Sequence, residues 1–214
     1  MILKLGRQLD VPLRDRNIML QSAGYASVYP QRPLEAPELC VAREIVERIL
    51  TGHLPHPALA VDRHWTLLCA NAAVSQLLTG VASHLLEGEV NVLRLSLHPE
   101  GLAPRILNLP EWRHYVLSRL HSDIERSADP VLETLREELE GFPVPRPARP
   151  DRTAAAPSQA IAVPLQLQTD AGLLSFLSTT TVFGTAIDVT LSEVAIEAFF
   201  PANQDTADAM VEHS

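Results

Sequence analysis

One stretch of the chain is rich in the β-branched and aromatic residues that favour strands: Leu173-Leu-Ser-Phe-Leu-Ser-Thr-Thr-Thr-Val-Phe183. Just before it, apolar residues alternate with others over 161–167, as in a strand with one buried face. Pro164 within that run favours an edge position or a bulge, because proline has no backbone N–H to donate to a neighbouring strand. Turn-forming residues at 169–172 separate the two runs, so the sequence predicts two strands joined by a turn.

Three further strands are expected. Residues 58–61 and 66–70 form two short apolar runs around the polar turn Asp62-Arg-His64. The segment 190–200 is ambiguous, because Thr190-Leu-Ser-Glu193 fits a capping box that begins a helix, whereas the apolar residues after it alternate as in a strand. We favour a strand that ends at Pro201, since the two strands before it need a partner.

Helical patterns occupy the rest of the main part of the chain. An amphipathic helix is predicted over 38–51, and its apolar stripe consists of Ala42, Ile45, Val46, Ile49 and Leu50. Asn71 is expected to cap a helix over 72–78, and Asp129 one over 130–141, because their side-chain oxygens can accept from N–H groups of a first turn. Helices are also expected at 91–97 and 111–127. The order predicts an α+β fold, a small antiparallel sheet of about five strands with helices packed on one face.

Proline-rich segments and the two ends of the chain mark its organisation. Residues 1–24 contain two short helical patterns that cannot bury their apolar faces alone, so they look like the tail of another domain. Residues 25–37 form a linker stiffened by prolines, and residues 38–207 form the main domain. Within it, 142–159 is expected to be a proline-rich loop, and 208–214 is an acidic tail.

The composition excludes several classes of protein. The chain has 214 residues, a formal net charge of −9 and 46% hydrophobic residues, enough for one sizeable core. An acidic surface repels phosphate, so the chain by itself is not expected to bind DNA. No apolar run is long enough to cross a membrane, residues 1–10 do not resemble a signal peptide, and Cys40 and Cys69 make no disulfide framework. We expect a cytoplasmic protein.

Sequence motifs for catalysis are absent. There is no glycine-rich phosphate loop, no Gly-x-Ser-x-Gly and no His-Glu-x-x-His. His53 and His56 lie in a segment broken by prolines, and His114 and His121 share one predicted helix, whereas a metal site needs three or four converging ligands. We therefore expect no enzymatic activity, no metal and no cofactor other than a bound fatty acid or similar small apolar molecule.

Six stretches in a definite order carry a resemblance to a known family: Pro57-Ala-Leu-Ala-Val-Asp-Arg-His-Trp65, Ala70-Asn-Ala-Ala73, Asn91-Val-Leu-Arg-Leu-Ser-Leu-His-Pro99, Arg105-Ile-Leu-Asn-Leu-Pro-Glu-Trp112, Ser175-Phe-Leu-Ser-Thr-Thr-Thr-Val-Phe-Gly184 and Phe199-Phe-Pro-Ala202. From about residue 25 to 207 the chain resembles the MmyB-like ligand-binding domain of bacterial transcription regulators. The resemblance implies a PAS-like fold and a sensory role, with a fatty-acid-like molecule as the expected ligand.

The beginning of the chain also resembles part of such a regulator. Residues 3–25 are similar to the last helices of a helix-turn-helix domain of the xenobiotic-response-element type, which precedes the ligand-binding domain in that family. The recognition helix would lie before Met1, so DNA binding is expected only through a helix-turn-helix that is largely absent from this chain. A homodimer is the expected assembly.

The resemblance further implies a ligand pocket between the helix over 111–127 and the sheet. Arg94 and Arg119 are the cations expected to hold a ligand carboxylate. The full set of expected ligand-binding residues is Leu67, Asn71, Leu93, Arg94, Leu97, Trp112, Tyr115, Val116, Arg119, Phe176, Ser178 and Thr180. Two alternatives remain open: the same residues can fill a closed core, and the domain can be a small-molecule-binding enzyme or a dimerisation module without a ligand.

Overall fold

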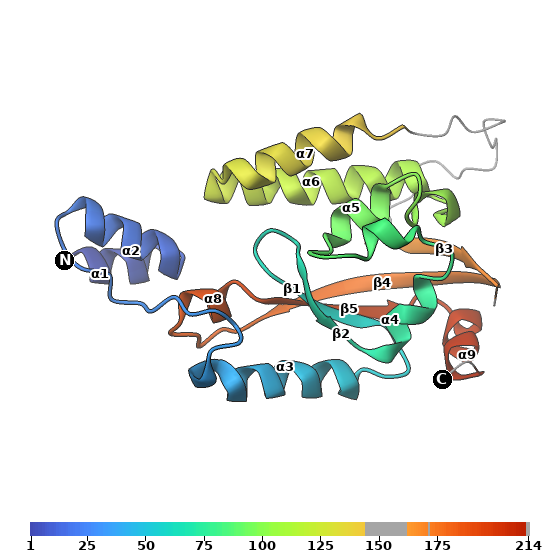
Figure 1. Ribbon diagram of the computed structural model, residues 1–214, viewed down its shortest axis with the longest axis horizontal. Helices are drawn as coiled ribbons and strands as arrows, with labels where there is room; N and C mark the ends of the chain where they lie inside the picture. Colours follow the sequence, from blue (N-terminus) through green and yellow to red (C-terminus); the bar gives the residue numbers. More distant parts are fainter. Residues whose placement is uncertain (144–161, 171, 213–214) are drawn as a thin grey trace.

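An antiparallel sheet organises the protein (Figure 1). A computed structural model describes residues 1–143, 162–170 and 172–212. Those residues form the strands β1 (Ala58–Val61), β2 (Leu67–Ala70), β3 (Leu165–Thr169), β4 (Gly172–Val182) and β5 (Ala195–Pro201), in the order β2-β1-β5-β4-β3. Every neighbouring pair is antiparallel and helices pack against the sheet, which confirms the expected α+β fold. The expected proline-rich loop lies, from residue 144 onward, outside the described residues.

Helices precede, interrupt and follow the strands. The described residues form α1 (Ile2–Gln8), α2 (Leu13–Ser22), α3 (Cys40–Gly52), α4 (Ala72–Leu77), α5 (Val92–Leu97), α6 (Leu109–Ser127), α7 (Pro130–Gly141), α8 (Val189–Ser192) and α9 (Gln204–Glu212). Short 3₁₀ turns lie at Pro37–Leu39, Ser83–Leu85 and Ala103–Arg105. Asp129 caps α7 as predicted, because its Oδ1 accepts from the N–H of Val131 at 2.9 Å.

The predicted turn and the ambiguous last strand both take definite forms. Thr169 pairs with Gly172 at the end of the β3–β4 hairpin, and Gly172 has a φ of +109°, which a residue with a side chain rarely adopts. The ambiguous segment contains a helical turn and a strand in succession. Asp188 caps α8 by accepting from the N–H of Thr190 at 2.9 Å, and β5 follows from Ala195. β5 then lies between β1 and β4 and pairs with both.

Helices cover both faces of the sheet, which corrects the expectation of helices on one face. Figure 1 shows α5, α6 and α7 on one side and α3 on the other. The alternation along β1 explains the arrangement, since Val61 belongs to the main core and Ala58 and Ala60 to a second one. That second core receives Val46 and Leu50 from α3. The small alanine side chains let the helix approach the strand.

The C-terminal helix belongs to the main core. The Oγ1 of Thr206, which is fully buried, accepts a hydrogen bond from the N–H of Ser175 in β4 at 2.9 Å. Met210 of the same helix is 2% exposed and packs in the cluster that contains Leu174. α9 therefore closes the end of the sheet next to the β3–β4 hairpin.

Candidate ligand-binding cleft

A cleft of about 900 Å³ lies between the N-terminal helices and one end of the main domain. Its walls come from α2, the turn between β1 and β2, the end of α6, the start of α7 and the segment around α8. These elements surround the left end of the sheet in Figure 1. The apolar side chains in the lining include Ile18, Val61, Trp65, Leu132, Val182 and Ala195. Of the residues predicted to bind a ligand, Arg119 and Thr180 line this cleft.

A buried ion pair forms part of the cleft wall. Arg119 of α6 donates to both carboxylate oxygens of Glu197 in β5, at 2.6 and 3.1 Å, and to the Oγ1 of Thr180 at 2.6 Å. The guanidinium carbon also lies 4.4 Å from the ring centre of Trp65. Burial alone lowers the pKa of Arg119, but the hydrogen bonds and charge of Glu197 outweigh it and leave the pKa raised. Glu197 is only 4% exposed, so this pair holds α6 on the sheet.

A second charged network lies at the start of α7. One carboxylate oxygen of Asp129 accepts from the Nε2 of His64 at 2.9 Å and from the guanidinium of Arg63, while the other caps the helix. Burial raises the pKa of Asp129, but these hydrogen bonds and the charge of Arg63 outweigh it and lower the pKa overall. The network fixes the turn between β1 and β2 against α7.

One ion pair joins the N-terminal helices to the main domain across this cleft. Arg14 of α2 donates to both carboxylate oxygens of Glu193, at 2.6 and 2.8 Å, and Arg63 lies 3.5 Å from the same carboxylate. The hydrogen bond to Glu193 raises the pKa of Arg14. One turn further along α2, the side chain of Asn17 accepts from the N–H groups of Val28 and Tyr29. The helix pair is therefore held by directional polar contacts at its edge.

Five of the apolar residues of the predicted pocket lie together in the main core. That set comprises Leu93, Leu97, Trp112, Val116 and Phe176, which are between 0% and 7% exposed. The indole N–H of Trp112 donates to the Oγ of Ser96 at 2.8 Å, so its polar atom is satisfied inside the protein. These side chains line neither the 900 Å³ cleft nor the smaller cavity described below. In this structure they fill the space between α6 and the sheet.

The remaining predicted residues divide between the cleft and other places. Arg119 and Thr180 line the cleft, and Tyr115 lies beside them with its hydroxyl 3.5 Å from Arg119. Ser178 shares the strand face of Phe176 and Thr180 and is half-buried, as is Leu67 in β2. Arg94 lies apart from Arg119, because it forms a bidentate pair with Glu138 of α7, at 2.6 and 2.7 Å. Both arginines expected to hold a carboxylate thus already hold one from the protein.

Asn71 does not cap α4 through its side chain, contrary to the prediction. Its Oδ1 accepts from the N–H of Ala58 at 3.1 Å, and its Nδ2 donates to the carbonyls of Leu50 and His56, at 2.9 and 2.8 Å. These backbone groups lie near the end of α3, in the following loop and at the start of β1, where the regular hydrogen bonding of helix and strand is interrupted. They can therefore bond to a side chain. Asn71 is therefore a brace between α3, the following loop and β1.

Sequence reasoning missed several residues that build this cleft. Glu197, Trp65 and the pair of Arg14 with Glu193 were not singled out. Glu197 offered one signal, since it is an acidic residue between Ile196 and Ala198 within an apolar strand. A charged residue at an inward position of a strand needs a buried partner. The partner itself lies 78 positions away in sequence and carries no local pattern.

A smaller cavity of about 340 Å³ lies at the opposite end of the sheet. Its wall includes Leu77, Arg105, Asp170, Leu174 and Met210. Arg105 donates to the backbone carbonyl of Leu77, and burial lowers its pKa. The cavity contains none of the predicted ligand-binding residues.

The described residues also contain one group that can hold a metal ion. It consists of His84, His98 and Glu100, which line neither cavity. The two pairs considered from the sequence do not form such a group: His53 bonds the carbonyl of Phe199 instead, at 2.8 Å, and His121 lies 3.4 Å from Glu125. Across the described residues, no helix is long and apolar enough to span a bilayer.

Comparison with protein families gives the fold and cleft a context. The family model for the MmyB-like transcription regulator ligand binding domain matches residues 42–212. The chain belongs to this family. The matched region of this MmyB-like domain begins within α3 and ends with α9, so among the described residues it contains the sheet, most of α3 and the helices from α4 to α9. None of the curated proteins compared with the chain matches it. The family is one of regulator domains that bind ligands, and the resemblance to this ligand-binding domain is confirmed over the matched residues.

Proposed function

We propose that this MmyB-like domain senses a small amphipathic molecule, such as a fatty acid, which binds in the 900 Å³ cleft. One observation carries the proposal: a chain of a ligand-binding regulator family has a cleft of that size, bounded by the main domain and the N-terminal helices together. Clefts of this volume suit drug-sized ligands. The strand order β2-β1-β5-β4-β3 supports the PAS-like description that the resemblance implies.

The two kinds of lining residue suit the two ends of such a ligand. Val61 and Leu132 form an apolar floor, and each CH₂ group buried there would contribute about 0.8 kcal/mol. Arg126 at the rim is suited to a carboxylate, because its side chain is 71% exposed and the ion pair that it forms with the nearby Asp123 is a weak surface pair. Arg119 is less suited to this role, because a ligand that displaced Glu197 from it would leave the buried Glu197 carboxylate without its partner.

A matched pair of probes tests this assignment. Dodecanoic acid should raise the melting temperature of the chain more than dodecanol does, because only the acid can pair with Arg126. Arg126→Gln should remove that difference, and Ile18→Gln should weaken binding of both probes. Arg48→Gln on α3 and Ile187→Gln, which change exposed residues outside the cleft, are the controls. Native mass spectrometry before and after organic extraction would show whether a ligand co-purifies.

The cleft assignment fails if neither probe shifts the melting temperature. It also fails if the cleft variants and their controls respond alike.

A second function, self-association, is favoured by the outer face of α3. Val41, Ile45 and Ile49 recur at intervals of four residues and are 67%, 41% and 41% exposed. This stripe faces away from Val46 and Leu50, which are buried against the sheet, so it is free for a second copy of the chain. We propose that this face forms a homodimer. Light scattering should then report a dimer for the chain and a monomer for Ile45→Glu, and a dimer that survives the change would refute it.

DNA contact would be made through a helix-turn-helix domain to which α1 and α2 belong, in a cytoplasmic regulator. With a net charge of −9, residues 1–214 alone should not retard operator DNA in a gel. Sequence-dependent retardation by this chain would contradict the proposal.

A further inference from the structure

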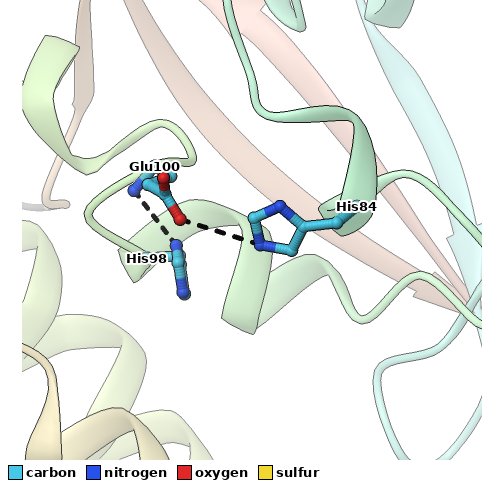
Figure 2. Close-up of side chains that lie close together, drawn as sticks. All are labelled: His84, His98 and Glu100. Carbon is cyan, nitrogen blue, oxygen red and sulfur yellow. Dashed lines mark hydrogen bonds and ion pairs between the residues drawn. The ribbon is translucent and has the colours of Figure 1, made fainter.

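A histidine pair and a carboxylate converge beside α5. The side chains of His84, His98 and Glu100 each bring a ligand atom within 4.8 Å of the others. Figure 2 shows the three groups turned toward a common point between two segments of chain. The Nε2 of His84 lies 3.8 Å from the Oε2 of Glu100, and the two imidazole centres are 5.9 Å apart. We propose that these residues bind a zinc ion at the surface of the domain.

The backbone holds the two segments in place before any metal arrives. His98 and Glu100 lie in one tight turn, in which the N–H of Gly101 donates to the carbonyl of His98 at 2.9 Å. Gly101 has no room for a side chain, because a Cβ there would collide with the carbonyl of Leu95. The N–H of Ala82 donates to the carbonyl of Glu100 at 3.0 Å, which brings the turn that carries His84 alongside. A preorganised site of this kind loses little conformational entropy on binding.

A hydrogen bond shows which ring nitrogen of His98 accepts. Its Nδ1 accepts a hydrogen bond from the N–H of Glu100 at 3.0 Å, so that nitrogen presents a lone pair and no proton. A metal ion needs the neutral imidazole in this form. An ion that takes this lone pair displaces the N–H of Glu100, a residue that lies exposed at the surface. Phe142 packs edge-on against the His98 ring, at 5.0 Å between centres, and steadies it.

The donor set favours zinc over the common hard cations. Two imidazole nitrogens and one carboxylate oxygen match zinc, with water completing its coordination, whereas magnesium and calcium prefer oxygen ligands throughout. A bound ion would fasten the turn around His84 to the end of α5, and so stabilise the folded chain. None of the three residues lines the cleft, so the zinc proposal stands or falls separately from the proposed function.

Calorimetric titration of the metal-stripped full chain with zinc chloride tests the site. One ion per chain should bind, and magnesium chloride should give no signal. His84→Ala and Glu100→Gln should each weaken zinc binding by about tenfold or more, since even the loss of an outer-shell partner has an effect of that size. His114→Ala, which removes an exposed histidine of α6, is the control and should leave the affinity unchanged.

A second readout makes the test independent of folding. Both cluster variants change exposed side chains, so they should keep the melting temperature of the metal-free chain and lose only the rise that zinc causes. The proposal is overturned if zinc does not bind, or if His84→Ala and Glu100→Gln bind it as tightly as the His114→Ala control does.

Discussion

At the scale of single residues, the pair formed by Arg119 and Glu197 is the most consequential contact in the domain. Glu197 is almost fully buried, and its carboxylate is satisfied by two guanidinium bonds and by the hydroxyl of Thr180, which donates at 2.8 Å. A buried carboxylate is tolerated only with such partners. The same contacts fix the positions of Arg119 and Thr180, which line the cleft.

Removing one member of the pair should be strongly destabilising. Arg119→Met should lower the free energy of unfolding by about 3–5 kcal/mol, because Glu197 would be left as an uncompensated buried charge. The double change Arg119→Met with Glu197→Leu should recover much of that loss. Urea unfolding measures both, with Arg48→Met on the exposed face of α3 as the control. A loss within about 0.5 kcal/mol of the control would contradict the assigned role.

Asp129 should make stability depend on pH in the acidic range. Its pKa is lowered in the folded protein, so the unfolded chain binds the proton more tightly. The stability it contributes is fully present above its ordinary pKa of 3.8 and is lost as the pH falls through the lower folded value. Urea unfolding at a series of pH values should show a smaller acid loss for Asp129→Asn than for the parent. Equal slopes for the two proteins would show that Asp129 has no such role.

At the scale of elements, the junctions between helices and strands depend on side chains that satisfy backbone groups. Asp129 and Asp188 do this locally, by capping the helix that follows each of them. Asn71 does it over a longer range, because its partners belong to α3, the next loop and β1. The side chain of the residue that precedes α4 thus forms its hydrogen bonds with other elements and not with α4.

Replacing Asn71 by Asp distinguishes a brace from a helix cap. At a cap, Asn and Asp are about equally good, so the change would be nearly neutral. As a brace, Asp would set a negative oxygen against the carbonyls of Leu50 and His56 and should lower the free energy of unfolding by roughly 2 kcal/mol or more. Thermal or urea unfolding of Asn71→Asp decides between them, and a neutral result would favour the cap.

At the scale of the whole molecule, the cleft is the place where the N-terminal helices and the main domain meet. Figure 1 shows α1 and α2 beside the main domain. The pair of Arg14 with Glu193 joins the two across the cleft. A ligand in the cleft would touch α2 and α6 together, so its binding could alter how the helix pair is held.

Loosening that joint should release the helix pair without unfolding the main domain. Glu193→Gln should speed backbone hydrogen exchange in residues 2–22, while exchange in β4 and β5 stays close to that of the parent. Glu87→Gln, which removes an exposed carboxylate elsewhere, is the control. If exchange in α1 and α2 is the same in Glu193→Gln as in this control, the ion pair does not hold the helices.

The local features of the protein could be predicted from sequence because their causes are local. Alternation and turn residues indicated the β3–β4 hairpin, and Asp129 followed by Pro130 indicated the start of α7. Trp112 and Val116 are four residues apart, a spacing that puts them on one face of α6, and both are buried. Six stretches of sequence were also enough for the family, which the match over 42–212 confirms.

Tertiary packing determined the features that join distant segments. β5 pairs with both β1 and β4, which brings Glu197 under Arg119 and leaves Ala58 and Ala60 facing α3. No pattern within a helix or strand encodes such partners, because a side chain carries the same local preference whichever charge it later meets. From the sequence, Arg119 was therefore predicted to be available for a ligand carboxylate. In the folded protein it pairs with the buried carboxylate of Glu197.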